Sequence, residues 1–436
     1  MARILLTSMP FAGHVGPLSA LTAELRRRGH RVVAHSGHKY RDRFVGAGAE
    51  WTSWRAARDF DDSDLAATFP EVGDGKGMRG GKANVEQVLL GTAAGQARDL
   101  LDVAHREPFD LIVADQLAFG GALAGERLGL PWVSVAVTPL TIPSRDLAPS
   151  GLPFPPSGSP VARVRDAVLR HLVRLAQRRF INPRLDRARA EVGLGPAPAA
   201  GLEGLYSPYL VLAQGVPGLE YPRSDLPGQV RFVGRLAPPP GPAATRELPS
   251  WWPELAAARA AGRPVVHVTQ GTLDVDPADL LRPAIDGLAG HPALVVATTG
   301  RTSAATLGGL PDNARVAPFL PHDLLLPLVD VMVTNGGWGG VLGAVQAGVP
   351  LVVAGDSLDK PEVARRVAWS GVGLDLRTGR PAAAKVRGAV ERVLGEQRFR
   401  ARAGELGAAL TAAGGPAAAG DLIENLLAGA AEPSPR

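Results

Sequence analysis

Two polar residues in the first part of the chain follow short apolar runs that are typical of buried parallel strands. His14 comes after the run 3–8, at the start of an expected helix over 15–29, and Asp115 directly follows the run 110–114. Because parallel strands end at one edge of their sheet, we expect the two side chains to lie together there. The helix dipole would keep the imidazole neutral and able to accept a proton, while the carboxylate would fix its tautomer and stabilise imidazolium.

Each of these residues also has a plainer interpretation. A single histidine is often no more than a polar surface residue, and Asp115 is well placed to cap the helix that begins near Phe119. Only the pairing of His14 with Asp115 favours a general base and its orienting acid.

A glycine-rich stretch between residues 330 and 366 carries the second candidate site. The apolar run 331–333 predicts a buried strand, 341–347 predicts a helix of small residues, and Asn335-Gly336-Gly337-Trp338-Gly339-Gly340 lies between them. The N–H groups of such a turn converge, the missing Cβ atoms allow close approach, and the helix dipole attracts an anion. The pattern favours a phosphate site, although glycines that merely end a strand remain the plainer alternative. No G-x-G-x-x-G opens a helix here, so this is not the dinucleotide fingerprint.

A second turn nearby is polar. It follows the apolar run 351–354 and contains Asp356, Asp359 and Lys360, whose side chains suit sugar hydroxyls. Thr272, in a further turn, has a hydroxyl and an N–H group that could reach a phosphate. We therefore predict a diphosphate at the glycine turn and sugar hydroxyls at the polar turn.

Strands and helices alternate through both parts of the chain. This alternation predicts an α/β protein of two doubly wound, Rossmann-like domains that face each other across a cleft. The predicted domains are 1–222 and 250–415, joined by a proline-rich linker over 223–249. Residues 416–436 form a C-terminal helix and tail that could pack back on the N-terminal domain.

The composition limits the function classes. The 436 residues are 45% hydrophobic and 20% charged, contain no cysteine and carry a net charge of +5. The arginine clusters 26–28 and 163–189 carry no known nucleic-acid reader motif and contain a single aromatic, Phe180, so nucleic-acid binding is not favoured. Arg163, Arg170, Arg174 and Arg178 recur at helical spacing, which indicates a solvated helix face. Because no signal segment or long apolar run is found, we expect a soluble, cytoplasmic protein without stable membrane insertion.

Several motifs resemble those of the family-1 glycosyltransferases of the GT-B fold, which include bacterial macrolide and polyketide glycosyltransferases and plant secondary-product glucosyltransferases. Gly13-His14-Val15 resembles the family's opening motif. Phe319-Leu320-Pro321-His322, the stretch 334–347, Gly348-Val349-Pro350 and Asp359-Lys360 resemble its donor signature. The resemblance covers nearly the whole chain.

The resemblance implies an inverting glycosyltransferase that needs no metal or other cofactor. Neutral His14, with Asp115 as its partner, would deprotonate an acceptor hydroxyl, which attacks the anomeric carbon as UDP or dTDP leaves. The N-terminal domain would bind a hydrophobic natural product, such as a polyketide, macrolide or phenol, and the C-terminal domain the nucleotide sugar. The partners implied are these two small molecules, in a monomer or weak homodimer.

The expected binding residues fall into two groups. The acceptor would lie near aromatic side chains of the N-terminal loops, namely Phe11, Trp51, Trp54 and Phe119. The donor would lie on the matched positions of the signature, namely Thr272, Phe319, His322, Asn335, Gly337, Trp338, Gly339, Gly340, Val341, Asp359 and Lys360.

Four positions depart from the family pattern. Asn335 replaces the histidine that usually touches the diphosphate, and Gly343 replaces the glutamate that commonly holds the ribose. His322 and Lys360 each stand where the family usually has glutamine. These four changes affect the prediction of a phosphate site little. They affect more strongly the prediction of which sugar and which base are bound. For Lys360, a simple ion pair with Asp359 is an equally good interpretation.

Three alternatives stay open on the sequence alone. The chain could be a lipid-directed glycosyltransferase, for which an exposed basic and apolar patch would be expected and none is clear. It could be a sugar-nucleotide epimerase of the same fold. It could also be a non-catalytic helper that binds a nucleotide sugar, against which the presence of both His14 and Asp115 argues.

Overall fold

The computed structural model describes residues 1–73, 77–152, 154–238, 247–271, 276–300 and 302–429. The chain divides into two compact units. The first unit comprises residues 1–217, 221–238 and 413–436, and the second comprises 218–220 and 239–412. No helix among the described residues is both long and apolar enough to span a membrane.

The first unit is built on a seven-stranded parallel sheet in the order β3-β2-β1-β4-β5-β6-β7. Its central strands are continuous runs of valine, leucine and isoleucine, as expected where helices cover both faces of a sheet. The strands are β1 (Arg3–Thr7), β2 (Arg31–Ser36), β3 (Glu50–Ser53), β4 (Leu111–Asp115), β5 (Trp132–Ala136), β6 (Leu210–Ala213) and β7 (Val230–Phe232). Strand β7 lies within the interval 223–249 that the sequence predicts as a linker.

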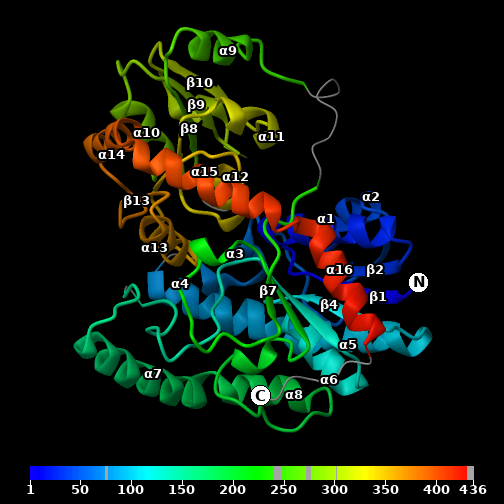
Figure 1. Ribbon diagram of the computed structural model, residues 1–436. Helices are drawn as coiled ribbons and strands as arrows, with labels where there is room; N and C mark the ends of the chain where they lie inside the picture. The colour runs from blue at the N-terminus through cyan, green and yellow to red at the C-terminus, as the bar shows by residue number, and fades with distance from the viewer. Residues whose placement is uncertain (74–76, 153, 239–246, 272–275, 301, 430–436) are drawn as a thin grey trace. The chain divides into compact units, whose positions relative to one another are not determined.

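The helices of the first unit cover its sheet (Figure 1). They are α1 (Ala12–Arg27), α2 (Arg41–Gly46), α3 (Leu65–Thr68), α4 (Gly77–Ala83), α5 (Leu90–Arg106), α6 (Phe119–Leu128), α7 (Pro160–Phe180), α8 (Asn182–Ala190) and α16 (Gly415–Ala428). Short 3-10 turns lie at η1 (His38–Tyr40), η2 (Pro70–Val72), η4 (Glu203–Leu205) and η5 (Pro217–Leu219), and a π-helix at η3 (Asn84–Leu89) precedes α5.

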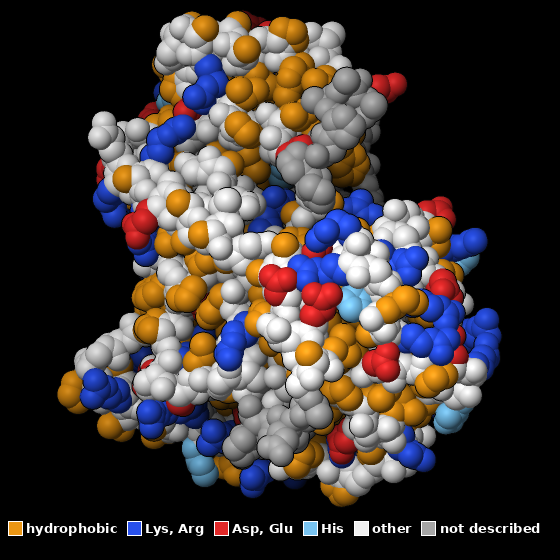
Figure 2. All heavy atoms as spheres, turned by 45° about the vertical axis from the view of Figure 1, so that its right-hand side comes forward, with side chains coloured by type: hydrophobic (Ala, Val, Ile, Leu, Met, Phe, Trp, Pro, Cys, Tyr) orange, Lys and Arg blue, Asp and Glu red, His pale blue; other side chains and the backbone are white. Residues whose placement is uncertain are grey.

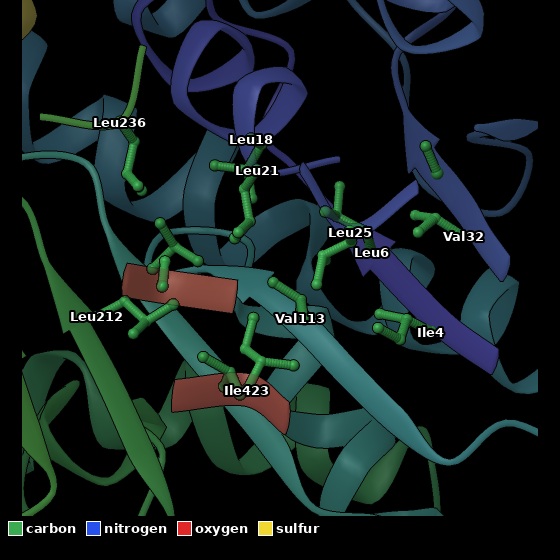
Figure 3. Close-up of a cluster of buried hydrophobic side chains, with 14 of the residues drawn as sticks. Ile4, Leu6, Leu18, Leu21, Leu25, Val32, Val113, Leu212, Leu236 and Ile423 are labelled. Atoms are coloured by element: carbon green, nitrogen blue, oxygen red, sulfur yellow. The ribbon is translucent and has the colours of Figure 1, made fainter. Parts of the chain in front are cut away.

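Helix α16 is part of the main core of the first unit. In Figure 3, Ile423 lies among Leu212 and Val113 of the sheet, and it is fully buried. Helix α16 is also held by charge, because Arg28 at the end of α1 pairs with Asp421 at 2.7 Å and with Glu424 at 2.5 Å. A segment remote in sequence therefore completes the packing around the first strands.

The second unit has a six-stranded parallel sheet in the order β10-β9-β8-β11-β12-β13. Its strands are β8 (Val265–Thr269), β9 (Leu294–Thr298), β10 (Ala314–Ala317), β11 (Val331–Thr334), β12 (Leu351–Val353) and β13 (Gly373–Asp375). Its helices are α9 (Pro253–Ala260), α10 (Leu281–Gly287), α11 (His322–Leu325), α12 (Trp338–Gln346), α13 (Lys360–Ser370), α14 (Ala383–Gly395) and α15 (Gln397–Ala412), with 3-10 turns η7 (Ala304–Leu307) and η8 (Leu326–Leu328).

The prediction of two doubly wound parallel sheets is confirmed. In each sheet the strand order reverses once, between β1 and β4 in the first and between β8 and β11 in the second. Open parallel sheets bind ligands at the carboxyl ends of their strands, at this point of reversal. Both candidate sites lie at such a point.

Candidate active site

His14 and Asp115 meet at the carboxyl ends of β1 and β4. His14 is in the first turn of α1, Asp115 is the last residue of β4, and the two strands are adjacent and parallel. His14 Nδ1 lies 2.7 Å from Asp115 Oδ2. The Asp115 side chain is fully buried, whereas 13% of the His14 side chain remains exposed. The arrangement hides the acid and leaves part of the imidazole accessible.

The other hydrogen bonds of Asp115 determine which member of the His14–Asp115 pair donates the hydrogen bond and which accepts it. Its Oδ2 accepts the N–H of Met9 at 3.1 Å and its Oδ1 accepts the N–H of Leu117 at 3.0 Å. Both carboxylate oxygens therefore act as acceptors toward backbone N–H groups, and Oδ2 acts as an acceptor toward His14 as well. The His14 Nδ1–H therefore donates to it, and Nε2 carries the lone pair that can take a proton.

A second aspartate, Asp62, anchors the beginning of α1. Its Oδ2 accepts the N–H of Ala12 at 2.9 Å and the hydroxyl of Tyr40 at 2.7 Å, and its Oδ1 pairs with Lys39. The N-cap residue, Phe11, makes no side-chain cap bond. Asp62 thus satisfies an N–H that would otherwise lack a partner, and it holds His14's helix in place.

Several aromatic rings pack beside the histidine. The ring of Phe11 lies 5.4 Å from His14 and 5.2 Å from Phe60, and the ring of Phe60 lies 5.9 Å from Trp54 and 5.6 Å from Phe69. These centroid distances are typical of tilted and edge-to-face aromatic pairs. The structure therefore brings two of the predicted acceptor residues, Phe11 and Trp54, into one group with His14.

The other two predicted acceptor residues lie elsewhere. Trp51 is on β3, where its ring stacks on Phe44 at 6.4 Å and packs against the hydrophobic core. Side chains alternate between the two faces of a strand, and that of Trp51 is on the core side. Phe119 begins α6, four residues after Asp115, and is buried.

Asp99 on α5 fixes the segment that carries Trp54 and Phe60. Its carboxylate accepts the N–H groups of Arg55, Ala56 and Ala57 at 2.8 to 3.1 Å. Burial alone would raise the pKa of Asp99, but its hydrogen bonds with His35 and these N–H groups outweigh burial and lower the pKa. Residues 55–57 are therefore tied to α5, and the short elements α3 and η2 follow them.

The glycine turn leads from β11 into α12, as predicted. Gly337 is the N-cap of α12, it supplies no side chain, and its carbonyl accepts the N–H of Val341 at 3.0 Å. The N–H groups of Trp338, Gly339 and Gly340 occupy the first turn of α12, where a helix has no internal partners for them. A Cβ built at Gly337 or Gly339 would meet no atom within 4 Å, and one at Gly340 only Met332, at 3.7 Å. Packing within the unit therefore leaves the Cβ positions of these three glycines open.

Three further residues shape this turn from behind. The Asn335 amide donates to the Gln270 carbonyl, which links the ends of β11 and β8. Gly336 has a φ of 94°, a conformation that side chains disfavour. A Cβ at Gly355 would lie 2.0 Å from the Asn335 carbonyl oxygen. These positions are fixed by the fold, in contrast to the open Gly339 and Gly340. Among the other predicted donor residues, Trp338 and Val341 are buried.

The polar turn between β12 and α13 has an unusual backbone. Leu358 has a φ of 52°, in the left-handed region, which is unfavourable for a residue with a large side chain. Backbone strain of this kind is concentrated at functional sites. Asp359 is the N-cap of α13 and is partly exposed. Lys360 is buried, and its Nζ donates to Ser357 Oγ at 3.0 Å. A buried ammonium therefore lies beside the strand ends.

Two further donor candidates lie on the connection before β11. Phe319 is 63% exposed, and His322 begins α11 with its ring 5.4 Å from that of His267. Burial, together with the neighbouring His322, lowers the pKa of His267 to about 3. Thr272, also predicted to bind the donor, lies outside the described residues.

Sequence reasoning missed Phe60, Asp62, Asp99 and Ser357. The first three belong to or hold a segment without periodicity, and no motif marks them. The acidic run Asp59, Asp61, Asp62 and Asp64 is the one signal that could have drawn attention to the α1 anchor.

Comparisons with known proteins agree with this architecture. Residues 283–426 match the family model described as the C-terminal domain of erythromycin biosynthesis protein CIII-like proteins. The chain is 41% identical over 427 residues to 4'-demethylrebeccamycin synthase of Lentzea aerocolonigenes, covering 98% of this chain and 100% of that protein. It is 32% identical over 423 residues to UDP-glycosyltransferase 2 of Phaeomoniella chlamydospora, covering 93% and 91% of the two chains. Among solved structures, the glycotransferase of kitacinnamycin superposes with a TM-score of 0.71 at 23% identity, covering 98% and 99%.

Proposed function

The chain belongs to the family-1 glycosyltransferases of the GT-B fold, related to those that make bacterial natural products, and on that premise we propose how it catalyses transfer. It moves a sugar from UDP or dTDP to a hydroxyl of a hydrophobic natural product, with inversion at the anomeric carbon. The first unit holds and activates the acceptor, and the second holds the donor.

The observation that carries the proposal is the bond between His14 Nδ1 and the buried carboxylate of Asp115. His14 Nε2 takes the proton of the acceptor hydroxyl while that oxygen attacks the anomeric carbon. The bond from this carbon to the diphosphate oxygen breaks, and the nucleoside diphosphate leaves. Asp115 stabilises the imidazolium that forms, which is the role of the acid in a catalytic triad.

The diphosphate is bound at the first turn of α12. The N–H groups of Trp338, Gly339 and Gly340 would donate to its oxygens, and the helix dipole would stabilise the charge that develops on it. Asn335 and Gly337 belong to the same proposed diphosphate site. The side chains of Phe319 and His322 are proposed to contact the nucleoside. Support comes from the open Cβ positions of Gly337, Gly339 and Gly340, where no side chain of the unit packs against the turn.

Asp359 and Lys360 are proposed to distinguish the donor sugar. Asp359 would accept bonds from sugar hydroxyls, and Lys360 would donate to another hydroxyl or to a phosphate oxygen. The position of Lys360 supports this assignment, because its ammonium is buried next to Ser357 at the end of β12.

The acceptor is proposed to be a flat, apolar molecule. Phe11, Trp54 and Phe60 form the aromatic group beside His14, and Phe119 begins the helix after Asp115. Aromatic rings of this kind bind planar apolar molecules through large contact areas. The product in the name of the Lentzea relative, 4'-demethylrebeccamycin, is a natural product as well. We also propose that the enzyme acts in the cytoplasm, as a monomer or weak homodimer.

The decisive experiment is transfer with a panel of donors and acceptors. The purified chain is incubated with UDP and dTDP sugars and with phenolic, polyketide and macrolide acceptors, and the anomeric configuration of each product is determined by NMR. We expect an inverted glycoside of a phenol or polyketide. A retained configuration would overturn the mechanism. Interconversion of the sugar nucleotide without acceptor would instead identify an epimerase, and binding without turnover a helper protein.

A further inference from the structure

Helix α7 presents apolar side chains directly to solvent. Val161, Val164, Val168, Leu172 and Leu175 are each at least half exposed, with values from 50% to 81%. In the part of the chain that the structure describes, most other large apolar side chains are buried. Figure 1 shows α7 at the edge of the first unit, with α8 beside it.

These five residues, which we call the α7 stripe, lie along one line of the helix. They are separated by three, four, four and three positions, so at 3.6 residues per turn they share one face. The opposite face is anchored, because Ala162 and Asp166 are buried and Arg170 donates to the Leu147 carbonyl at 2.6 Å. The α7 stripe is therefore the outermost line of the helix and covers none of the core of its unit.

Exposed arginines lie beside the α7 stripe, most of them on one side of it. Helix α7 contains six arginines, at positions 163, 165, 170, 174, 178 and 179, and its only acidic residue is Asp166. Asp166 is buried and paired with Arg165 at 2.8 Å. Arg163, Arg174, Arg178 and Arg179 are exposed. Figure 2 shows Lys or Arg and hydrophobic side chains side by side at the lower left of the molecule.

We propose that α7 docks on the surface of a membrane that contains anionic lipids. A basic amphipathic helix lies in the plane of such a surface, with its apolar side chains at the boundary between headgroups and acyl chains. The exposed arginines would pair with lipid phosphates, and each basic residue near an anionic surface strengthens binding several-fold. The inference goes beyond the proposed transfer reaction, because none of the dyad, glycine-turn or polar-turn residues takes part in it.

Charge favours the membrane over a second copy of the chain. Two α7 stripes packed against each other would bring arginines of one helix near arginines of the other, with Asp166 buried and unable to compensate. An anionic lipid surface instead offers phosphates at any spacing, and it accommodates a stripe of small aliphatic side chains without a shaped groove.

The test is co-sedimentation of the purified full-length chain with lipid vesicles. Vesicles of phosphatidylcholine are compared with vesicles of phosphatidylcholine and phosphatidylglycerol, at low and at high salt. We expect binding to the anionic vesicles that weakens as salt rises. Leu172→Ser with Leu175→Ser should weaken it about tenfold by removing apolar area. Arg174→Gln with Arg178→Gln should weaken it at least about tenfold.

Matched controls separate α7 from general surface effects. Val45→Ser removes an apolar side chain that is 46% exposed on α2, and Arg41→Gln with Arg106→Gln removes the same charge from exposed positions on other helices. These controls should bind as the wild type does. Thermal melting checks that every variant is folded.

Four results would overturn the proposal. They are no binding of the wild type to anionic vesicles, equal binding to neutral vesicles, equal losses in α7 and control variants, and a dimer in light scattering that the Leu172→Ser, Leu175→Ser variant abolishes. The last of these would assign the α7 stripe to a second copy of the chain. Because vesicle binding is measured without donor or acceptor, the result does not depend on the proposed function.

Discussion

The two strand-to-helix corners of this enzyme use the same architecture in opposite ways. The corner from β1 to α1 and the corner from β11 to α12 each lie where the strand order of a parallel sheet reverses. In the first corner the group that we propose to act is a side chain, His14, held by Asp115 from the neighbouring strand. In the second corner it is the backbone at Gly339 and Gly340, where side chains are absent and where we propose that the diphosphate binds. A helix N-terminus thus supports either a positioned base or an anion cradle, and the residues around it decide which.

This difference predicts two kinds of sensitivity to mutation. The first corner should fail when a side chain is removed, and the second when one is added. The following predictions test that contrast, from the largest expected effect to the smallest.

Replacing His14 with alanine should have the largest effect. We expect His14→Ala to lower the turnover number by about a hundredfold or more, because the general base is lost, while UDP or dTDP binding measured by calorimetry stays unchanged. His105→Ala, at an exposed position at the end of α5, is the matched control and should retain full activity. Full activity of the His14→Ala variant would refute the assignment of His14 as the general base.

Adding a side chain to the glycine turn should remove donor binding without unfolding the protein. The Cβ positions of Gly339 and Gly340 are open, so Gly340→Val should keep its melting temperature. Its affinity for UDP or dTDP should fall about ten- to hundredfold, the cost of losing hydrogen bonds to a charged group. Gly388→Val, at an equally open position on α14, serves as the control. Unchanged nucleotide affinity in Gly340→Val would mean that the donor binds elsewhere.

The polar turn should affect the sugar more than the nucleotide. Asp359→Ala should weaken binding of the sugar nucleotide about ten- to hundredfold and leave the bare nucleoside diphosphate nearly unaffected. Lys360→Gln should alter the order of preference among donor sugars without abolishing transfer. Calorimetry with UDP or dTDP and with the matching sugar nucleotide measures both. Equal losses of affinity for the two ligands would show that Asp359 and Lys360 do not contact the sugar.

A buried histidine of the second unit should make the protein sensitive to acid. His267 on β8 lies next to the Val296 carbonyl, and its pKa is lowered to about 3, chiefly by burial. Because the folded state holds His267 neutral, the unfolded state binds the proton first as the pH falls below about 6.5. Between pH 6.5 and pH 5 this should cost the second unit about 2 kcal/mol of unfolding free energy.

Denaturant unfolding at several pH values measures this loss. His267→Leu should be less stable at neutral pH, since it gives up the bond to Val296, but should depend less steeply on pH. A variant with the wild-type slope would assign the acid sensitivity to other groups, such as His35 and Asp99 in the first unit, whose lowered pKa values act in the same direction.

The sequence predicted those parts of the site that follow directly from strand ends. Asp115 ends β4, His14 follows β1 in the first turn of α1, and the glycine turn directly follows β11, so within each unit the parallel sheet alone places these residues at its carboxyl edge. Asp62 and Asp99 could not be found in this way, because hydrogen bonds across the fold place them. Trp51 was expected beside the acceptor because it is aromatic and near Trp54, but the pleat of β3 turns it toward Phe44.

For helix α7, too, only part of the arrangement could be predicted from the sequence. Its arginine spacing predicts a solvated face, which is correct for Arg163, Arg174 and Arg178. The sequence does not tell which of the remaining faces of α7 packs against the rest of the first unit. Only the burial of Ala162 and Asp166 reveals that the valines and leucines of the α7 stripe point outward.

The position of α16 has a consequence for the order in which the two units can fold during synthesis. Ile423 and Ala419 fill the core beneath α1, yet the ribosome adds them after the whole second unit. A nascent first unit therefore keeps the apolar side chains around Leu18 and Leu21 uncovered until almost all of the chain has emerged. The second unit, continuous from residue 239 to 412, can finish folding earlier than the unit that precedes it in the sequence.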